Sequence, residues 1–401
     1  MNMEFLDMDN FILSVIVPTK NRAKYANKTV RQILQVCGKD VEIVVQDNST
    51  DDILEKMLED IKRLENLKYN HIYELLSFVD NFDQALQLAT GEYVIMVGDD
   101  DGVTTGLLTT VIWAKEREID VIRPNLNIVY FWPGSRVFPK EMDNGRLKIV
   151  SSSKRIHWEQ AANGVCELLK NGCQDYLECE LVKIYHGIVK RKLLDKIKES
   201  TGRYVGGLSP DIYLSVALSL VFEKSMVCVD IPLTISGICG GSGSSQSSTG
   251  EHTGKLKDAP HFKGHISYKW SKQVPAFYSV ETIWADSALA AIRDIAPRKA
   301  GNFRYEKLLD VCLRKYPVYR EVAIASYREN KGNKIKYYLW KIGELARRSK
   351  KSICYRLHKH HIEEWEEVED ILKASNICEE HLGKAYNEFE EICNAAKIPG
   401  L

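Results

Sequence analysis

The sequence lacks a net charge, because 55 lysine and arginine side chains face 55 aspartate and glutamate side chains in 401 residues. A protein without an overall positive charge has no general attraction to polyanions, so we expect no nucleic-acid partner. Long apolar runs are also missing. The longest, Ile212 to Phe222, contains serines and falls short of the ~20 residues that a membrane-spanning helix needs, so we expect no transmembrane segment.

The ten cysteines show none of the paired short spacings of zinc sites or redox motifs. We interpret them, including the group Cys166, Cys173 and Cys179, as reduced thiols that pack in the core. The N-terminal segment Met1 to Asp9 contains acidic side chains and no basic one, unlike secretory and transit sequences. We therefore expect a cytoplasmic protein, peripheral at the inner face of the cell membrane if it binds lipid.

Length and composition predict a globular protein of two units. A chain of 401 residues exceeds the size at which one hydrophobic core usually stops growing, and its 44% of hydrophobic residues can bury a core. A glycine- and serine-rich tract from Gly237 to Gly254 predicts a loop, either a flexible linker or a mobile lid. We expect a boundary near Pro260, which separates a domain over 1–259 from a mainly helical segment over 260–401 that associates with membrane or acceptor.

The N-terminal part alternates strand-like and helix-like patterns. Phe11 to Val17 is apolar and β-branched, as in a strand buried on both faces, and Pro18 is expected to end it. A helix that ends at Gly38 follows. Val41 to Val45 and Tyr93 to Val97 predict two more buried strands. This alternation predicts an α/β fold with a Rossmann-like, parallel central sheet flanked by helices.

Other elements have weaker patterns. We expect strands at 69–73, 121–122 and 181–189, helices at 51–64, 82–88, 107–115, 160–169 and 211–222, and a hairpin within 125–138. The last of these helices has Ser209 and Pro210 at its start, which are favoured capping and first-turn residues.

Polar residues follow three of the strands, at Thr19 to Arg22, Asp47 to Asp52 and Asp99 to Asp101. Parallel strands bring their carboxyl ends to one edge of a sheet, where ligands bind in open α/β proteins. Three adjacent carboxylates repel one another, and Mg²⁺ or Mn²⁺ held by such oxygens, waters and substrate phosphates would remove that cost. The alternative is a solvated turn in which aspartate only forms the loop.

Four blocks occur in a characteristic order: the run LSVIVPTKNR over 13–22, Val41 to Asp52, Asn81 with ATGEY over 89–93, and Gly98-Asp99-Asp100-Asp101. Together they resemble the family 2 glycosyltransferases, which have the GT-A fold. The likeness is specific over roughly the first 105 residues, weakens to about residue 240 and ends there.

The resemblance implies an inverting, metal-dependent glycosyltransferase of the hexosyltransferase type. Its donor would be a nucleotide sugar, first of all a UDP-sugar, and its acceptor a hydroxyl of a glycan or polyprenol-linked molecule, as in bacterial polysaccharide, lipopolysaccharide and capsule biosynthesis. Two alternatives stay open. One is a non-catalytic nucleotide-sugar or glycan-binding protein; the other is a sugar nucleotidyltransferase, which should carry a glycine-rich phosphate loop where this chain has Pro18 to Arg22.

The resemblance also implies which residues bind the donor. They are Pro18, Thr19, Asn21, Arg22, Asp47, Asn48, Asn81, Asp99 and Asp100. Among them, Pro18, Thr19 and Asp47 would contact the nucleoside, and Asp99 the ribose side.

Mn²⁺ or Mg²⁺ would be held by Asp100 and Asp101, with His252 as a further ligand once the glycine-rich loop closes. Two departures from the family pattern leave this assignment open. Gly98 stands where a first aspartate could fall, so the register can slide by one residue. Asp80 stands where an arginine often precedes Asn81, which puts a phosphate contact there in doubt.

Inverting transfer needs a base that removes the proton of the acceptor hydroxyl. By the resemblance, this base is an acid at a helix start beyond the acidic motif, and Asp211 in GGLSPD over 206–211 fits that place. The same residues would also suit a helix start for capping and dipole reasons alone. Glu178, Glu180 and His186 are the rival candidates.

The segment from Lys331 to His361 has ten basic residues and one acidic residue, Glu344, among aromatic and aliphatic side chains. Such an amphipathic basic helix suits an anionic membrane surface as a further partner. The alternative is a solvated basic face that pairs with the acidic stretch from Glu363 to Asp370.

Overall fold

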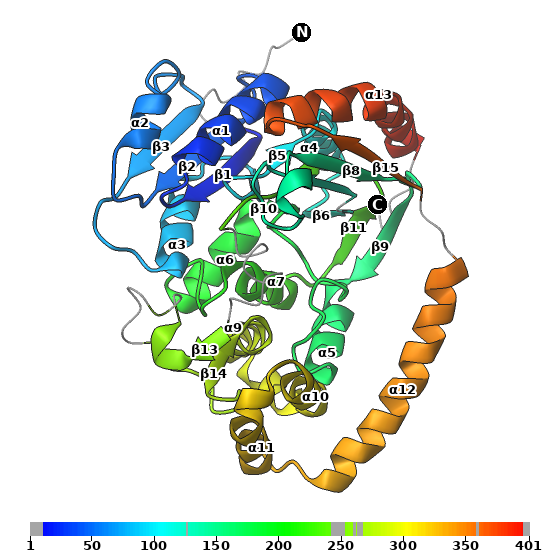
Figure 1. Cartoon of the computed structure of the whole chain (residues 1–401). Helices are drawn as coiled ribbons and strands as arrows, with labels where there is room; N and C mark the ends of the chain where they lie inside the picture. Colours follow the sequence, from blue (N-terminus) through cyan, green and yellow to red (C-terminus); the bar gives the residue numbers. More distant parts are fainter. Residues whose placement is uncertain are drawn as a thin grey trace.

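The computed structural model describes residues 11–125, 127–241, 253–259, 262, 268–357 and 361–395. Within these residues, an eight-stranded sheet lies at the centre of the fold, with helices around it (Figure 1). The strand order is β3-β2-β1-β4-β10-β6-β11-β9. In chain order the strands are β1 (Leu13–Thr19), β2 (Glu42–Asp47), β3 (Leu67–His71), β4 (Tyr93–Met96), β6 (Val121–Pro124), β9 (Ile156–Gln160), β10 (Ile188–Lys190) and β11 (Ser225–Val229).

A second sheet of five strands lies beside the first, in the order β15-β8-β7-β12-β5. Its strands are β5 (Gly102–Val103), β7 (Ile128–Phe131), β8 (Arg146–Val150), β12 (Thr234–Ile238) and β15 (Ile362–Glu366). A two-stranded ribbon joins β13 (Thr253–Lys255) to β14 (Phe277–Ser279).

Helices cover the sheets and dominate the second half of the chain (Figure 1). They are α1 (Ala23–Cys37), α2 (Ile53–Met57), α3 (Phe78–Leu88), α4 (Gly106–Glu116), α5 (Ala161–Lys170), α6 (Arg191–Thr201), α7 (Pro210–Val221), α9 (Val280–Ile295), α10 (Glu306–Lys315), α11 (Arg320–Glu329), α12 (Lys334–Leu357) and α13 (Ile371–Ala395). The predicted α/β class, with a helix-flanked central sheet and a mainly helical C-terminal segment, is confirmed.

The first strands are apolar because both of their faces are buried. All seven residues of β1 are buried, and successive side chains enter different hydrophobic clusters: Ile16 packs in one, while Val15 and Val17 pack in the other. In β2, Val44 and Val45 divide in the same way. A strand between two cores reads as a continuous apolar run, which is why the sequence predicts this part of the fold correctly.

The prediction of a parallel sheet is only partly correct. Strands β3, β2, β1 and β4 are parallel, whereas β10 runs antiparallel to both β4 and β6. The strand predicted over 181–189 shrinks to Ile188–Lys190. Leu181, Val182 and Ile184 are buried in chain that contacts β4 through an isolated bridge between Tyr185 and Met96, in which the amide of Met96 donates to the carbonyl of Ile184 at 2.9 Å. Their apolar pattern therefore reflects burial without a β-ladder.

Pro18 does not end β1, which continues to Thr19 with Pro18 opposite Gln46. The pairing of β1 with β4 stops at Ile16, two residues earlier. The missing amide hydrogen of Pro18 therefore falls beyond the end of the β4 ladder, where no ladder bond is lost.

Three other local predictions change in extent. The helix expected over 51–64 is regular only in α2, and irregular turns follow. The helix expected over 82–88 begins earlier, at Phe78, because the hydroxyl of Ser77 accepts a hydrogen bond from the amide of Asp80 and caps it. The hairpin expected within 125–138 is wrong, since β7 pairs with the later strand β8.

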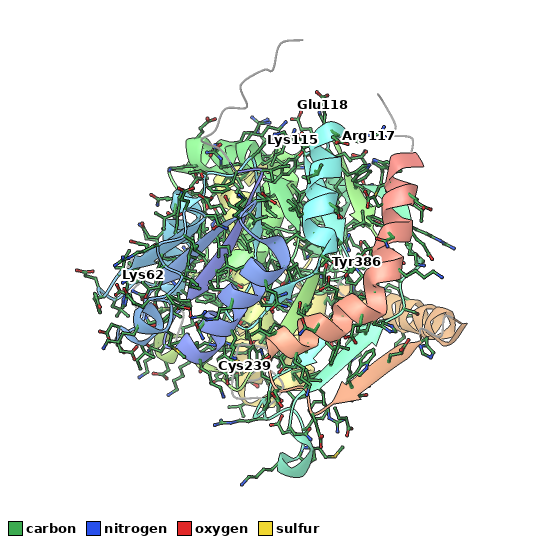
Figure 2. The ribbon with its side chains drawn as sticks, turned by 90° about the horizontal axis from the view of Figure 1, so that it is seen from above. Lys62, Lys115, Arg117, Glu118, Cys239 and Tyr386 are labelled. Carbon is green, nitrogen blue, oxygen red and sulfur yellow. The ribbon has the colours of Figure 1, made fainter. Side chains whose placement is uncertain are left out.

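The C-terminal segment returns to the part of the chain before residue 260 at three places. Helix α9 packs against α7 within one hydrophobic cluster, and β15 pairs with β8. Helix α13 lies on α1 and α4, where the ring of Tyr386 would collide with a Cβ at Gly106 (Figure 2). The division into 1–259 and 260–401 stays a prediction about folding units. Within the described ranges, none of the helices is both long and apolar enough to span a bilayer.

Candidate active site

The three adjacent aspartates follow β4 in a tight, buried turn. Asp99, Asp100 and Asp101 are 3%, 5% and 1% exposed, which rules out the solvated loop. Their backbone is held from two other elements. The hydroxyl of Thr29 on α1 donates to the carbonyls of Asp99 at 3.0 Å and Asp101 at 2.8 Å, and the indole N–H of Trp132 donates to the carbonyl of Asp100 at 2.8 Å.

Arg22 joins the loop after β1 to this turn. Its Nη1 lies 2.9 Å from Asp99 Oδ1 and its Nη2 lies 2.9 Å from Asp100 Oδ2, while the hydroxyl of Thr19 donates to Asp99 Oδ2 at 2.7 Å. Burial raises the pKa of Asp99 to about 7 even though Arg22 opposes the shift, and burial raises the pKa of Asp100 as well. The aspartates therefore do not depend on a metal alone for counter-charge, because Arg22 supplies one.

Asp101 is bound by the protein through both carboxylate oxygens. Oδ2 accepts hydrogen bonds from the amide of Gly98 at 2.5 Å and the hydroxyl of Tyr185 at 2.7 Å, and it lies 3.3 Å from His186 Nε2. Oδ1 accepts from the amide of Gly237 at 2.7 Å. With these partners Asp101 anchors the turn. Both oxygens of Asp99 are bound as well, by Arg22 and Thr19, whereas the contacts of Asp100 with Arg22 and with the amide of Cys239 both involve Oδ2. Which of these carboxylates binds a cation stays a prediction.

Gly98 and Gly237 are required by close packing around the turn. A Cβ at Gly98 would lie 2.7 Å from the hydroxyl of Tyr185, and a Cβ at Gly237 would lie 1.8 Å from the carbonyl oxygen of Asp100. An aspartate could not replace Gly98 without moving Tyr185. The register of the acidic motif relative to the family stays a prediction.

The loop after β2 is buried and satisfied internally. Asp47 Oδ1 accepts from the amide of Ser49 at 2.8 Å and from its hydroxyl at 2.5 Å, and Oδ2 accepts from the hydroxyl of Tyr69 at 2.9 Å. The amide group of Asn48 donates to the carbonyls of Ile72 and Glu74 at 2.8 and 2.7 Å. In this arrangement both side chains shape the loops; their contact with a nucleoside stays a prediction.

Asn21 and Asn81 tie neighbouring loops to the end of β1. Asn21 has a positive φ of 56°, and its amide donates to Ser49 Oγ at 2.7 Å. Asn81 donates through Nδ2 to the carbonyl of Thr19 at 3.2 Å. Its Oδ1 is buried and has no hydrogen-bond partner among the described residues, so an acceptor is available beside the strand end.

Asp211 begins the first turn of α7 immediately after Pro210. Its Oδ2 accepts a hydrogen bond from the hydroxyl of Tyr176 at 2.6 Å, and its Oδ1 accepts one from the hydroxyl of Ser209. The amine of Lys183 donates to the carbonyl of Tyr176 at 2.9 Å, and burial lowers the pKa of this lysine to about 7. These contacts attach Asp211 to the segment 176–187, which also carries the Tyr185 and His186 that contact Asp101.

The structure assigns different places to the remaining candidates. His186 is buried against Asp101 and accepts or donates a hydrogen bond with Thr234 at 2.8 Å. Glu178 is exposed, and Glu180 lies within the electrostatic reach of Glu159 and Arg123. His252 lies outside the described residues.

Sequence reasoning missed several contributors to the turn, namely Thr29, Trp132, Tyr185 and Cys239. Cys239 contacts Arg22 through its sulfur, and its amide donates to Asp100 Oδ2 at 3.1 Å. Tyr185 stands next to His186, one of the rival candidates for the base, and this position is the feature of the sequence that comes closest to indicating Tyr185. Thr29 is an ordinary helix residue, and nothing in its sequence context distinguishes it.

Comparison with known proteins confirms the resemblance over the N-terminal part. Residues 14–134 match the model of Glycosyl transferase family 2. A curated relative, GalNAc(5)-diNAcBac-PP-undecaprenol beta-1,3-glucosyltransferase of Campylobacter jejuni, is 33% identical over 103 residues. That match covers 25% of this chain and 33% of the relative, so the chain spans about a third of the relative's length.

Solved structures give more distant likenesses over more of the chain. TarS 1-349 of S. aureus in complex with UDP-GlcNAc is 17% identical, with a TM-score of 0.42, over 79% of this chain and 92% of TarS 1-349. The mannosyltransferase PcManGT of Pyrobaculum calidifontis in complex with GDP-Man and Mn²⁺ is 15% identical, with a TM-score of 0.38, over 92% of this chain and 87% of its own.

Proposed function

We propose that this protein is an inverting glycosyltransferase that moves a sugar from a nucleotide sugar to a hydroxyl of a glycan or polyprenol-linked acceptor in bacterial glycan biosynthesis. The observation that carries the proposal is the buried turn Asp99 to Asp101, joined through Arg22 and Thr19 to the carboxyl end of β1 within the segment that matches family 2. The name of the C. jejuni relative places that enzyme's acceptor on undecaprenol, which supports a lipid-linked acceptor here.

The residues of the turn fit a divalent cation. Asp99 and Asp100 are nearly fully buried carboxylates, and burial raises the pKa of both despite Arg22, so a further positive charge beside them would be stabilising. Hard oxygen ligands of this kind suit Mn²⁺ or Mg²⁺. When bound, the metal would neutralise the charge of the donor diphosphate. Asp101, already bound by four protein groups, would hold the turn in place, and a ligand role for His252 stays a prediction.

We assign the general base to Asp211. The hydroxyls of Tyr176 and Ser209 donate to its carboxylate and hold its orientation at the start of α7. In the reaction, Asp211 would take the proton from the acceptor hydroxyl as that oxygen attacks the anomeric carbon, and the nucleoside diphosphate would leave from the opposite side.

Turnover tests this proposal. The full chain is incubated with UDP-, GDP- and dTDP-sugars, Mn²⁺ and a polyprenyl-diphosphate-linked glycan, and the released nucleoside diphosphate is measured. We expect Asp211→Asn to reduce transfer ~10²–10⁴-fold and to leave donor binding intact. Asp310→Asn is the matched control, because Asp310 also accepts from a tyrosine hydroxyl, that of Tyr337 at 2.9 Å, on α10. Saturable nucleotide binding without any released diphosphate would identify a non-catalytic binder.

We further propose that α12 binds an anionic membrane surface. Its side chains at positions 335, 338, 339, 342 and 345 recur at helical spacing and form one stripe; they are Ile335, Tyr338, Leu339, Ile342 and Leu345, exposed by 59% to 73%. On a helical projection, Lys334 and Lys341 flank the stripe on one side and Lys336 and Arg347 on the other. In the interface plane of a bilayer the stripe would enter the acyl boundary and the basic residues would meet lipid phosphates.

The other face of α12 contacts the protein. The hydroxyl of Tyr337 donates to Asp310 on α10, and Figure 1 shows the rest of α12 running along the side of the molecule away from the central sheet. Each basic residue near an anionic surface contributes about 1 kcal/mol to binding. Lys334 and Lys336 would contribute most fully, because Arg347 also pairs with Glu344 at 2.7 Å and Lys341 lies 3.6 Å from Asp310.

Co-sedimentation with vesicles tests the membrane proposal. We expect the chain to bind phosphatidylglycerol vesicles at low salt and to lose binding at high salt. The double variant Leu339→Glu, Ile342→Glu keeps good helix formers and should bind at least tenfold more weakly. Val318→Glu is the control, because Val318 is 88% exposed but lies outside the stripe. Equal binding by the double variant and the parent would refute a membrane role for α12.

A further inference from the structure

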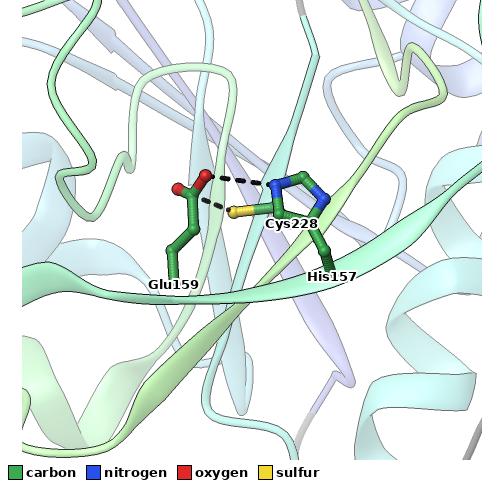
Figure 3. A group of neighbouring side chains, drawn as sticks. All are labelled: His157, Glu159 and Cys228. Carbon is green, nitrogen blue, oxygen red and sulfur yellow. Dashed lines mark hydrogen bonds and ion pairs between the residues drawn. The ribbon is translucent and has the colours of Figure 1, made fainter.

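A second cluster of metal-ligating side chains lies on β9 and β11, away from the acidic turn. His157 Nε2 lies 3.1 Å from Glu159 Oε1, and Cys228 Sγ lies 3.2 Å from Glu159 Oε2 (Figure 3). One nitrogen, one oxygen and one sulfur atom thus lie within 4.8 Å of one another. A nitrogen, an oxygen and a sulfur atom from three side chains can therefore face one ion.

The sheet itself brings these side chains together. Strands β9 and β11 are antiparallel, with His157 directly opposite Cys228 and Glu159 opposite Met226. His157 and Glu159 are two residues apart and therefore point to the same face of β9, and Cys228 points to that face from the neighbouring strand. Because β9 is the last strand of the sheet, the cluster is reached from the side of the molecule.

We propose that His157, Glu159 and Cys228 form a binding site for a borderline divalent metal ion of the zinc class. Imidazole, thiolate and carboxylate are the ligands that zinc accepts, and a tetrahedral zinc ion with bonds of about 2.0–2.3 Å holds its ligand atoms about 3.3–3.8 Å apart. The ligand atoms here need to move only slightly to reach that spacing. His157 has a side chain 53% exposed, which leaves a further coordination position open to water.

The surroundings of Glu159 support its role as a ligand. Arg123 Nη1 lies 2.7 Å from Glu159 Oε2, whereas Oε1 faces His157. The carboxylate can therefore bind a metal through Oε1 while Arg123 fixes its orientation through Oε2, as the outer hydrogen-bond partners of metal ligands commonly do. Glu180 lies close enough to raise the pKa of Cys228 by its charge, and it would add a fourth negative or ligating group beside the ion.

A metal ion binds cysteine as the thiolate and histidine as the neutral imidazole, so protons compete with the ion and the affinity should fall as the solution is acidified. The site differs in kind from the acidic turn: a zinc-class ion prefers its nitrogen and sulfur, and Mg²⁺ prefers the all-oxygen turn. The bound ion would join the edge strand β9 to β11 and stabilise the native state.

Cobalt is the probe that tests this site. The full chain, freed of metal by a chelator, is titrated with Co²⁺ while the thiolate-to-cobalt charge-transfer absorption is recorded. We expect a saturable band at one equivalent that Zn²⁺ removes and Mg²⁺ does not. Cys228→Ser should abolish the band, and His157→Gln should weaken Co²⁺ binding at least tenfold. Cys166→Ser is the control, because Cys166 is an exposed thiol on α5 outside the cluster.

A parent chain without the band, or a band that survives in Cys228→Ser, would overturn the proposal. His157 is more than half exposed, so His157→Gln keeps the fold and carries the test alone if Cys228→Ser does not fold. None of these readouts uses sugar transfer, so the result is independent of the proposed enzymatic function.

Discussion

Replacing Arg22 by methionine tests the electrostatics of the acidic turn. The guanidinium lies 2.9 Å from both Asp99 and Asp100, whose side chains are 4% and 6% exposed, while Arg22 itself is 27% exposed. Methionine keeps an unbranched apolar stem but removes the charge. Breaking a buried ion pair from one side costs about 3–5 kcal/mol, because an uncompensated charge stays buried, and we expect a loss of that size in the free energy of unfolding.

The size of the loss should depend on pH. Asp99, whose pKa burial already raises to about 7, escapes part of the cost by taking up a proton, so the loss should be smaller at pH 6 than at pH 8. Urea denaturation followed by circular dichroism measures it. Mn²⁺ should restore part of the stability of Arg22→Met if the cation binds between the freed carboxylates.

Arg31→Met provides the comparison. Arg31 pairs with Asp60 at 2.7 Å, but the two side chains are 32% and 63% exposed, so this pair should contribute at most about 1 kcal/mol. Equal losses in Arg22→Met and Arg31→Met would refute the view that the buried carboxylates depend on Arg22. A pH-independent loss would refute the proton uptake by Asp99.

Three further predictions concern the surroundings of the site. Burial lowers the pKa of Lys183 to about 7 from an ordinary value of 10.5, so between these pH values the unfolded chain binds one more proton than the folded chain and stability should rise with pH. Lys183→Met should remove that rise in urea midpoints measured from pH 7 to 10. An unchanged slope in the variant would refute the prediction. Gly237→Ala places a Cβ 1.8 Å from the carbonyl oxygen of Asp100, so it should lower the free energy of unfolding by ~1–3 kcal/mol in denaturation and weaken nucleotide binding measured by calorimetry. Gly343→Ala on α12 is the control, because its Cβ meets open space and should not destabilise the chain. Tyr185→Phe removes a 2.7 Å hydrogen bond to the Asp101 carboxylate and should lower the free energy of unfolding by ~1.5–3 kcal/mol. Tyr93→Phe removes a bond of equal length to the neutral carbonyl of Ile119 and should cost less. The reverse order in denaturation midpoints would contradict the anchoring role of Asp101.

The sequence predicts best where a residue's pattern has one structural cause. The apolar runs of β1, β2 and β4 reflect burial between two cores, and the acidic triplet comes directly after β4 in the sequence. The sequence therefore predicts that Asp99 to Asp101 lie at the same edge of the sheet as Thr19 to Arg22. By contrast, Leu181, Val182 and Ile184 are as apolar as a strand but serve the core from irregular chain. Periodicity alone cannot separate the two cases.

Partners far apart along the chain account for most of what was missed. The local sequence of the triplet shows only repulsion between carboxylates, which predicts a need for a metal. Its counter-charge, Arg22, lies 77 positions before Asp99, and its hydrogen-bond donor Gly237 lies 136 positions after Asp101. The cluster on β9 and β11 also could not be predicted from the sequence, because His157 and Cys228 become neighbours only through the register of these two strands. Motif spacing carries no information about such pairs.

The return of the C-terminus to the N-terminal part determines when this protein can finish folding during synthesis. Strand β15 completes the edge of β8, Ser375 accepts a hydrogen bond from Gln32 across 343 positions of sequence, and the carbonyl of Cys393 accepts one from the indole of Trp113. During synthesis, β8 and the outer faces of α1 and α4 therefore stay exposed until residues 362–393 have left the ribosome. Premature termination near residue 259 would leave those surfaces uncovered, and the product should aggregate or be degraded.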